Sequence, residues 1–403
     1  MNRFGMVTAF ASAALIVAAC GASPDNETVG EDPDPTTVAT NATTLAGSEG
    51  MPAGPSALTD RDADAFPDPL VPVDEIISGG PPPDGIPPLD TPVFGDVADS
   101  IDQLEPAEAV VALEIDGDAR AYPVRVLIWH EIVNDTVGGS PVSVTYCPLC
   151  NSAVSYLRVV RGVETTFGTS GSLYASALVM YDRLTESLWT HFDGQAIVGV
   201  LAGDRLEPIA SPLMSWEEFV EAYPTGKVLD WTQTGFERDY GRNPYEGYDN
   251  PDTDPFLFRG VVDDRERAKQ RVVGISIDGA SVAYSMEEVA SGERSVTMTT
   301  VGDRDLVILW QSGQSSALDD SQIGGGDDVG SVGVFVPVVN DAPVTLTVAG
   351  DEFVDEETGS TWNVAGIATK GPLAGSRLDR VQHLDTFWFA WSTYRPGTTL
   401  IGG

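Results

Sequence analysis

The chain has 403 residues, a formal net charge of −39, and 61 acidic against 22 basic residues. A surface this acidic repels nucleic acid and anionic lipid head groups, so we exclude a nucleic-acid-binding function. Hydrophobic residues make up 42% of the chain, which is enough for an apolar core, whereas three cysteines are too few for a fold stapled by disulfides.

The first twenty residues are typical of an export signal. An apolar run ends in Val-Ala-Ala at residues 17–19 and then Cys20, which resembles the lipobox of a bacterial lipoprotein. We therefore expect residues 1–19 to be a signal peptide and Cys20 to be lipidated, with membrane lipid as a partner. The alternative is an ordinary signal peptide with an incidental cysteine. Either way, the predicted location is the cell envelope outside the cytoplasmic membrane, lipid-anchored in the first case.

Residues 20–72 are predicted to form an acidic, Pro-rich, disordered tether. They are rich in Ala, Thr, Gly, Pro, Asp and Glu and have almost no aromatic residues, so they cannot bury much apolar surface. Ordered structure is expected to begin near Val73.

The rest of the chain contains an internal duplication. Residues 110–117 match residues 272–279, and residues 201–206 match residues 373–378, in the same order in both halves. We therefore predict two related lobes, the first lobe at 73–235 and the second lobe at 272–403, joined by a connecting segment at 236–271.

Each lobe is predicted to begin with two strands joined by an Asp-Gly turn, a signal of a hairpin. More strand-like runs follow, and each lobe closes with one amphipathic helix. In the first lobe this helix follows Ser215, a good N-cap residue with Glu218 three positions on. The predicted fold class is α+β, mostly β.

Four residues in the first lobe could hold a soft metal or carry out redox chemistry: His130, Cys147, Cys150 and His191. The cysteines form a Cys-Pro-Leu-Cys motif directly after a strand-like run. In the second lobe the matching positions carry no Cys or His. A role common to both lobes therefore cannot explain these four residues, and they indicate one site in the first lobe.

A metal site is the first hypothesis for these residues. Two cysteines separated by two residues chelate one ion through a tight turn, and His130 and His191 would complete four-coordination. Copper is the preferred ion because soft thiolates outside the cytoplasm hold Cu(I) well, and zinc is the alternative. Such a site would serve redox chemistry or metal handling, with metal-dependent oxidoreductase activity as one form.

Thiol–disulfide exchange is the second hypothesis, with Cys147 as the nucleophile, Cys150 as the resolving thiol and no cofactor. Against it, the segment after the pair reads as a strand, not as a helix whose N-terminus would stabilise a thiolate. A structural disulfide in a non-catalytic binding module is the third reading. Glu131, Asp182 and Asp193 are candidates to orient the histidines or carry protons. No substrate or protein partner can be identified from these residues.

Several motifs resemble those of a known family. They lie at residues 79–87, 129–135 (Trp-His-Glu-Ile-Val-Asn-Asp), 145–150 (Thr-Tyr-Cys-Pro-Leu-Cys), 167–171, 188–191 and 238–245. In these motifs the chain is similar to DUF3179, a domain of unknown function, over roughly residues 75–290. The resemblance implies an exported or membrane-anchored domain built around the Cys-Pro-x-Cys and His residues. It implies no activity.

Overall fold

The computed structural model describes residues 50–100 and 102–402, all of which belong to one compact unit, Ala46–Gly403. The predicted signal peptide, Cys20 and most of the predicted tether lie outside the described residues. Residues 50–72, predicted as the end of the tether, are packed on the first lobe. Ala57 is fully buried, and the Leu70 N–H donates to the Ile197 carbonyl. Ordered structure therefore begins earlier than predicted.

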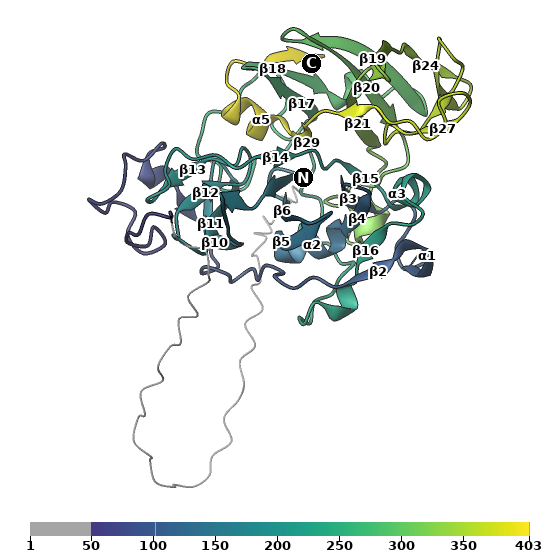
Figure 1. Cartoon of the computed structure of the whole chain (residues 1–403). Helices are drawn as coiled ribbons and strands as arrows, with labels where there is room; N and C mark the ends of the chain where they lie inside the picture. Colours follow the sequence, from purple (N-terminus) through teal and green to yellow (C-terminus); the bar gives the residue numbers. More distant parts are fainter. Residues whose placement is uncertain (1–49, 101, 403) are drawn as a thin grey trace, which may run out of the picture. The chain divides into compact units, whose positions relative to one another are not determined.

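Strands predominate over helices in the described residues, and the helices are short, which confirms the predicted α+β, mostly β fold class (Figure 1). The α-helices are α1 (Val97–Ser100), α2 (Val124–His130), α3 (Trp216–Ala222), α4 (Met286–Val289) and α5 (Trp388–Tyr394). Three short 3-10 turns are η1 (Val73–Glu75), η2 (Trp231–Gln233) and η3 (Ile323–Gly325).

The first lobe has three main sheets and one small hairpin. One sheet has the order β15 (Leu213–Ser215), β3 (Ala109–Ile115), β4 (Asp118–Pro123), β16 (Lys227–Leu229) and β2 (Phe94–Asp96). The second has the order β14 (Pro208–Ile209), β7 (Ser152–Leu157), β6 (Ser140–Cys147) and β5 (Ile132–Val137). The third has the order β1 (Ile77–Ser78), β10 (Phe167–Tyr174), β11 (Ala177–Asp182), β12 (Leu188–Thr190) and β13 (Ala196–Val198). The hairpin is β8 (Val159–Val160) and β9 (Val163–Glu164).

The second lobe, green to yellow in Figure 1, has three four-stranded sheets in a similar order, without counterparts of β1 and β2. Its first sheet is β29 (His383–Phe387), β17 (Arg271–Ile277), β18 (Ala280–Ser285) and β30 (Thr399–Ile401). Its second is β19 (Arg294–Val301), β20 (Arg304–Gln311), β21 (Ser331–Val336) and β28 (Asp379–Arg380). Its third is β24 (Leu346–Ala349), β25 (Glu352–Asp355), β26 (Thr361–Trp362) and β27 (Ala368–Lys370), and its hairpin is β22 (Val338–Val339) and β23 (Ala342–Pro343).

The local signals read from the sequence form as predicted. The β3–β4 turn places Asp116 and Gly117 at φ 50° and 83°, both in the left-handed region that a two-residue hairpin turn requires. Helix α3 begins with a capping box. The Ser215 hydroxyl accepts from the Glu218 N–H, and the Glu218 carboxylate accepts from the Ser215 N–H.

One side-chain motif occurs in both lobes with the same hydrogen bonds. In the first lobe the Trp189 indole donates to the Asp182 carboxylate at 3.0 Å. In the second lobe the Trp362 indole donates to the Asp355 carboxylate, also at 3.0 Å. The two lobes therefore share a similar strand order and a buried polar anchor.

The lobes also share one apolar core. The largest buried cluster contains first-lobe residues such as Val144 and Cys150 together with Phe387, Trp388 and Trp391 of the second lobe. Strand β29 lies beside β7, so the second lobe packs directly against the strand that follows the cysteine motif. The site below is consequently built by both lobes.

Candidate thiol site

The two cysteines lie at the tip of the β6–β7 hairpin. Strand β6 ends at Cys147, strand β7 begins at Ser152, and residues 148–151 form the turn between them. Asn151 closes the turn at φ 47°, a conformation that asparagine adopts more readily than most residues. Cys147 and Cys150 are 1% and 0% exposed, and both are free thiols.

The surroundings of Cys147 favour the thiolate. Burial by itself disfavours a charge on sulfur. Hydrogen bonds from the Cys150 thiol and from the backbone N–H groups of Leu178, Cys150 and Leu149 outweigh this effect and lower the pKa of Cys147. These amides play the part of a helix N-terminus, which the strand after the motif does not supply.

Cys150 lies in different surroundings and stays protonated. Burial first, and then the neighbouring Cys147, raise the pKa of Cys150. Its Sγ lies 2.9 Å from the Ser152 Oγ, and that Oγ lies 2.9 Å from His191 Nε2. His191 Nδ1 in turn lies 2.8 Å from the Thr145 hydroxyl. Four side chains therefore form one buried chain of hydrogen bonds.

The direction of the protons in this chain can be inferred from its far end. The Thr145 hydroxyl donates to the Val154 carbonyl at 2.6 Å, so it can only accept from His191. His191 therefore carries its proton on Nδ1, and its Nε2 accepts from Ser152. The Cys150 thiol has one proton, which it can donate either to the Ser152 Oγ or to Cys147. Burial lowers the pKa of His191 to about 3, so the imidazole is neutral at pH 7.

His130 is separate from this chain. It is the last residue of α2, and its Nδ1 donates to the Pro87 carbonyl at 2.7 Å. Its Nε2 lies 2.6 Å from the Tyr240 hydroxyl, and burial lowers the pKa of His130 to about 4. A neutral His130 therefore accepts from the Tyr240 hydroxyl. It links Pro87, which lies between β1 and β2, to the connecting segment.

Glu131 is the predicted accessory residue that does lie beside the thiols. It follows α2 at φ 58°, and its carbonyl accepts from the Tyr146 N–H, next to Cys147. Burial first, and then the charge of Cys147, raise the pKa of Glu131 well above 4.5. The surroundings of Glu131 therefore favour its neutral, protonated form beside Cys147.

Asp182 and Asp193 bind partners other than the His191 imidazole. Asp182 accepts from Trp189 and from the Thr185 hydroxyl, so it anchors the β11–β12 turn. Asp193 accepts from Thr190 and lies 3.7 Å from two arginines.

The predicted four-residue metal set does not converge in this structure. Both ring nitrogens of His130 and of His191 contact other groups, as described above. Across residues 50–100 and 102–402, no group of three or more His, Cys, Asp or Glu side chains is arranged to hold a metal ion.

The connecting segment covers the cysteine turn. The Tyr248 hydroxyl donates to the Leu149 carbonyl at 3.1 Å, and it also accepts from the Phe256 N–H at 3.1 Å. Burial first, and then the neighbouring Glu131 and Cys147, raise the pKa of the Tyr245 phenol. The buried Lys269 ammonium donates to the Tyr248 carbonyl and so holds Tyr248 in place over the cysteine turn.

Removal of the Tyr248 hydroxyl is expected to expose the thiols more often. Tyr248→Phe keeps the ring but loses both hydrogen bonds, each worth about 1 kcal/mol. We expect the rate of thiol labelling by a neutral alkylating agent in native buffer to rise about threefold to thirtyfold, because labelling requires the cover to open. Tyr181→Phe, in which the lost hydroxyl bonds to Asp84 away from the thiols, is the matched control. Equal labelling rates in wild type and Tyr248→Phe would contradict this role.

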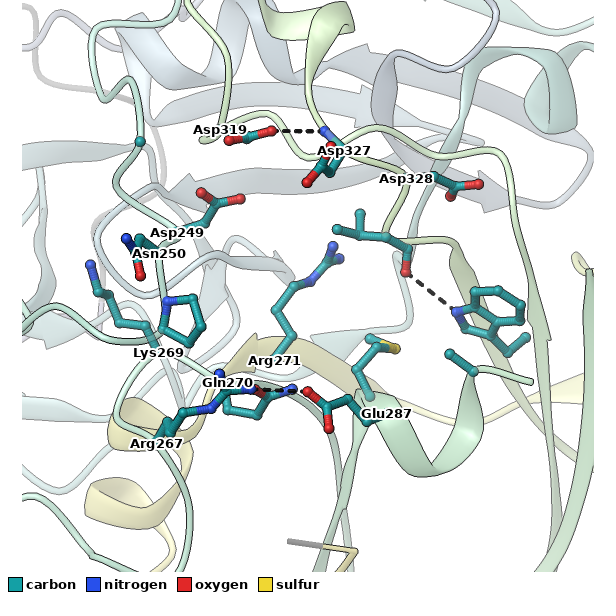
Figure 2. Close-up of a pocket in the computed structure, with 16 residues that line it drawn as sticks. Asp249, Asn250, Arg267, Lys269, Gln270, Arg271, Glu287, Asp319, Asp327 and Asp328 are labelled. Atoms are coloured by element: carbon teal, nitrogen blue, oxygen red, sulfur yellow. Dashed lines mark hydrogen bonds and ion pairs between the residues drawn. The ribbon is translucent and has the colours of Figure 1, made fainter. Parts of the chain in front are cut away.

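A pocket of about 630 Å³ lies between the connecting segment and the second lobe (Figure 2). Arg271 reaches into its centre, with Asp249, Asp319 and Asp327 on one side and Arg267 on the other. Neither cysteine lines this pocket. Its link to the thiols runs through Arg271, whose guanidinium pairs with Asp385 of β29.

Ser152, Thr145 and Tyr248 belong to the site although the sequence reading gave them no role. Ser152 follows Cys150 by two residues, a spacing that could have drawn attention to it. Thr145 lies two residues before Cys147 and therefore on the same face of β6. The position of Tyr248 had no comparable signal, because it comes from a segment without helices or strands.

The fold and the site define a β-rich protein with one buried pair of free thiols at the tip of a hairpin. The chain belongs to the protein family of unknown function DUF3179, whose model matches residues 83–398. No curated protein and no solved structure matches the chain. Within the described residues, no helix is long and apolar enough to cross a membrane.

Proposed function

We propose that this protein carries out thiol–disulfide exchange through Cys147 and Cys150. The observation that carries the proposal is the asymmetry of the pair. Cys147 is surrounded by hydrogen-bond donors that favour a thiolate, whereas Cys150 is a protonated thiol beside a chain of hydrogen bonds that leads through Ser152 to a neutral histidine. A nucleophilic thiolate beside a protonated resolving thiol is the arrangement that exchange requires.

In the first step the Cys147 thiolate attacks one sulfur of a substrate disulfide. A Cys147–substrate disulfide forms, the substrate S–S bond breaks, and one substrate thiolate leaves and takes up a proton. In the second step the Cys150 thiol gives up its proton and its sulfur attacks Cys147. The Cys147–substrate bond breaks, and the second substrate thiolate leaves and takes up a proton. The sum is one dithiol oxidised and one disulfide reduced to two thiols.

A soft-metal site is the second candidate, and the two adjacent free thiols favour it. Two thiolates suit Cu(I), so this metal site would have Cys147 and Cys150 as its ligands and would not include the histidines. Copper bound there would supply electron transfer or be handed on to a partner. The lipid anchor at Cys20 and a location in the cell envelope remain part of either proposal.

We further propose that the two lobes arose by internal duplication and that the second copy lost the thiols. Strand register supports this: Cys147 pairs with Ser152 in the first lobe, and Gln311 pairs with Ser331 in the second. Gln314 contacts Ser331 as Cys150 contacts Ser152. In this proposal Ser331 corresponds to Ser152 of the first lobe.

The test is a redox titration of the full chain, purified under reducing and anaerobic conditions. Samples equilibrated with defined ratios of reduced and oxidised glutathione are acid-quenched, alkylated and weighed by mass spectrometry. We expect a single two-electron transition to a Cys147–Cys150 disulfide, and less than a tenth of an equivalent of metal. Thiols that stay reduced at every ratio would refute exchange. About one equivalent of copper, lost in the Cys147→Ser/Cys150→Ser variant, would support the metal site instead.

A further inference from the structure

The second lobe touches the cysteine turn through one strand, β29. The backbone carbonyl of Cys150 accepts two hydrogen bonds from it, one from the Thr386 hydroxyl at 2.7 Å and one from the Phe387 N–H at 3.1 Å. Thr386 is fully buried, so water does not compete for this carbonyl. Cys150 is thus held by a strand more than two hundred residues away in the sequence.

The next residue of the turn is held by the same strand. Asn151 Nδ2 lies 3.5 Å from the Asp385 carboxylate, and Asn151 Oδ1 accepts from the Tyr146 hydroxyl at 3.0 Å. Asp385 is itself held by Arg271, the arginine at the centre of the pocket in Figure 2. The second lobe therefore contacts two successive residues of the turn, Cys150 and Asn151.

The contacts to Cys150 act on its backbone carbonyl, which oxidation of the thiols does not change chemically. They restrict where the Cys150 sulfur can lie relative to Cys147. Restricting two reacting groups in this way raises their effective concentration, which governs both the stability of an intramolecular disulfide and the rate of its closure.

We infer that Thr386 is a positioning residue for Cys150, and that the second lobe completes the thiol site of the first. The inference rests on the proposed exchange function and deepens it by assigning the degenerate lobe a part in the reaction. A hydrogen bond of this kind accounts for roughly a twofold to tenfold change in an equilibrium or rate constant.

The test compares Thr386→Val, which keeps the shape and loses the hydroxyl, with Thr386→Ser, which keeps the hydroxyl. Two quantities are measured on the full chain. The first is the equilibrium constant for disulfide formation against glutathione. The second is the rate at which a Cys147–glutathione mixed disulfide, prepared by mixing oxidised glutathione with reduced protein, is resolved by Cys150. A urea unfolding curve of the dithiol form is recorded alongside.

We expect Thr386→Val to lower both constants roughly twofold to tenfold, and Thr386→Ser to restore them to within about twofold of wild type. A purely structural role would move the urea midpoint and leave the resolution rate unchanged, and that result would overturn the inference. If wild type itself forms no disulfide, the proposed function fails. If wild type forms it and both variants behave like wild type, only the positioning role fails.

Discussion

Cys147→Ser is expected to abolish thiol–disulfide exchange. A serine hydroxyl is not ionised at neutral pH, so the donors around this position would surround a neutral group and no nucleophile would be present. The rate of reduction of a small disulfide, followed by absorbance of the released thiol, should fall on the order of a thousandfold or more. The urea midpoint should change little, because the volume of the side chain is nearly conserved.

Cys150→Ser is the matched comparison, and its outcome should be qualitatively different. The first attack by Cys147 remains, so one equivalent of substrate thiol is released and the protein is left as a mixed disulfide. Mass spectrometry should show one added substrate group on Cys147. If instead Cys150 carries the adduct in the Cys147→Ser variant, the assignment of nucleophile and resolving thiol is reversed.

His191→Gln is expected to change how stability depends on pH. In the folded protein, burial lowers the pKa of His191 to about 3 from an ordinary value of 6.5. Below pH 6.5 the unfolded chain therefore binds a proton that the folded chain excludes, and the stability due to His191 is lost as the pH falls from 6.5 toward 3. The loss is about 1.4 kcal/mol for each pH unit, or about 3 kcal/mol between pH 6.5 and 4.5.

The measurement is urea unfolding of wild type and His191→Gln between pH 7.5 and 4.5. The variant should be less stable at pH 7.5, because Ser152 and Thr145 lose their partner, and the difference should shrink by about 3 kcal/mol on going to pH 4.5. Comparing the two proteins cancels the opposite contribution of buried acids such as Glu131, whose pKa is raised. A difference that is independent of pH would show that His191 titrates normally in the folded state.

Local features of the fold were predictable because they depend on few neighbours. The Asp-Gly turns and the capping box of α3 follow from residues within four positions of each other, and both form as predicted. Residues 50–72 were predicted to be a disordered tether, but they are packed on the first lobe. A polar stretch such as residues 50–72 becomes ordered only because the first-lobe sheet offers it partners, and composition does not reveal those partners.

The site was predictable in its residues but not in its geometry. Cys147, Cys150 and His191 do lie in one buried region, linked through Ser152, because β6, β7 and β12 meet there. His130 lies only 17 positions before Cys147, yet it ends α2 and points its ring nitrogens at Pro87 and Tyr240. Closeness in sequence does not fix the direction of a side chain. The contact from Thr386 spans both lobes and had no local signal.

In the proposed exchange reaction, the hydrogen bonds between β29 and Cys150 couple the redox state of the thiols to the docking of the two lobes. Any free energy by which those contacts favour the disulfide must appear, with equal size, as tighter docking of the second lobe when the disulfide is present. A partner that binds the second lobe, or a ligand that draws Arg271 away from Asp385, would therefore shift the reduction potential without touching either sulfur. Conversely, oxidation of the thiols by the surroundings would change the free energy with which the two lobes dock.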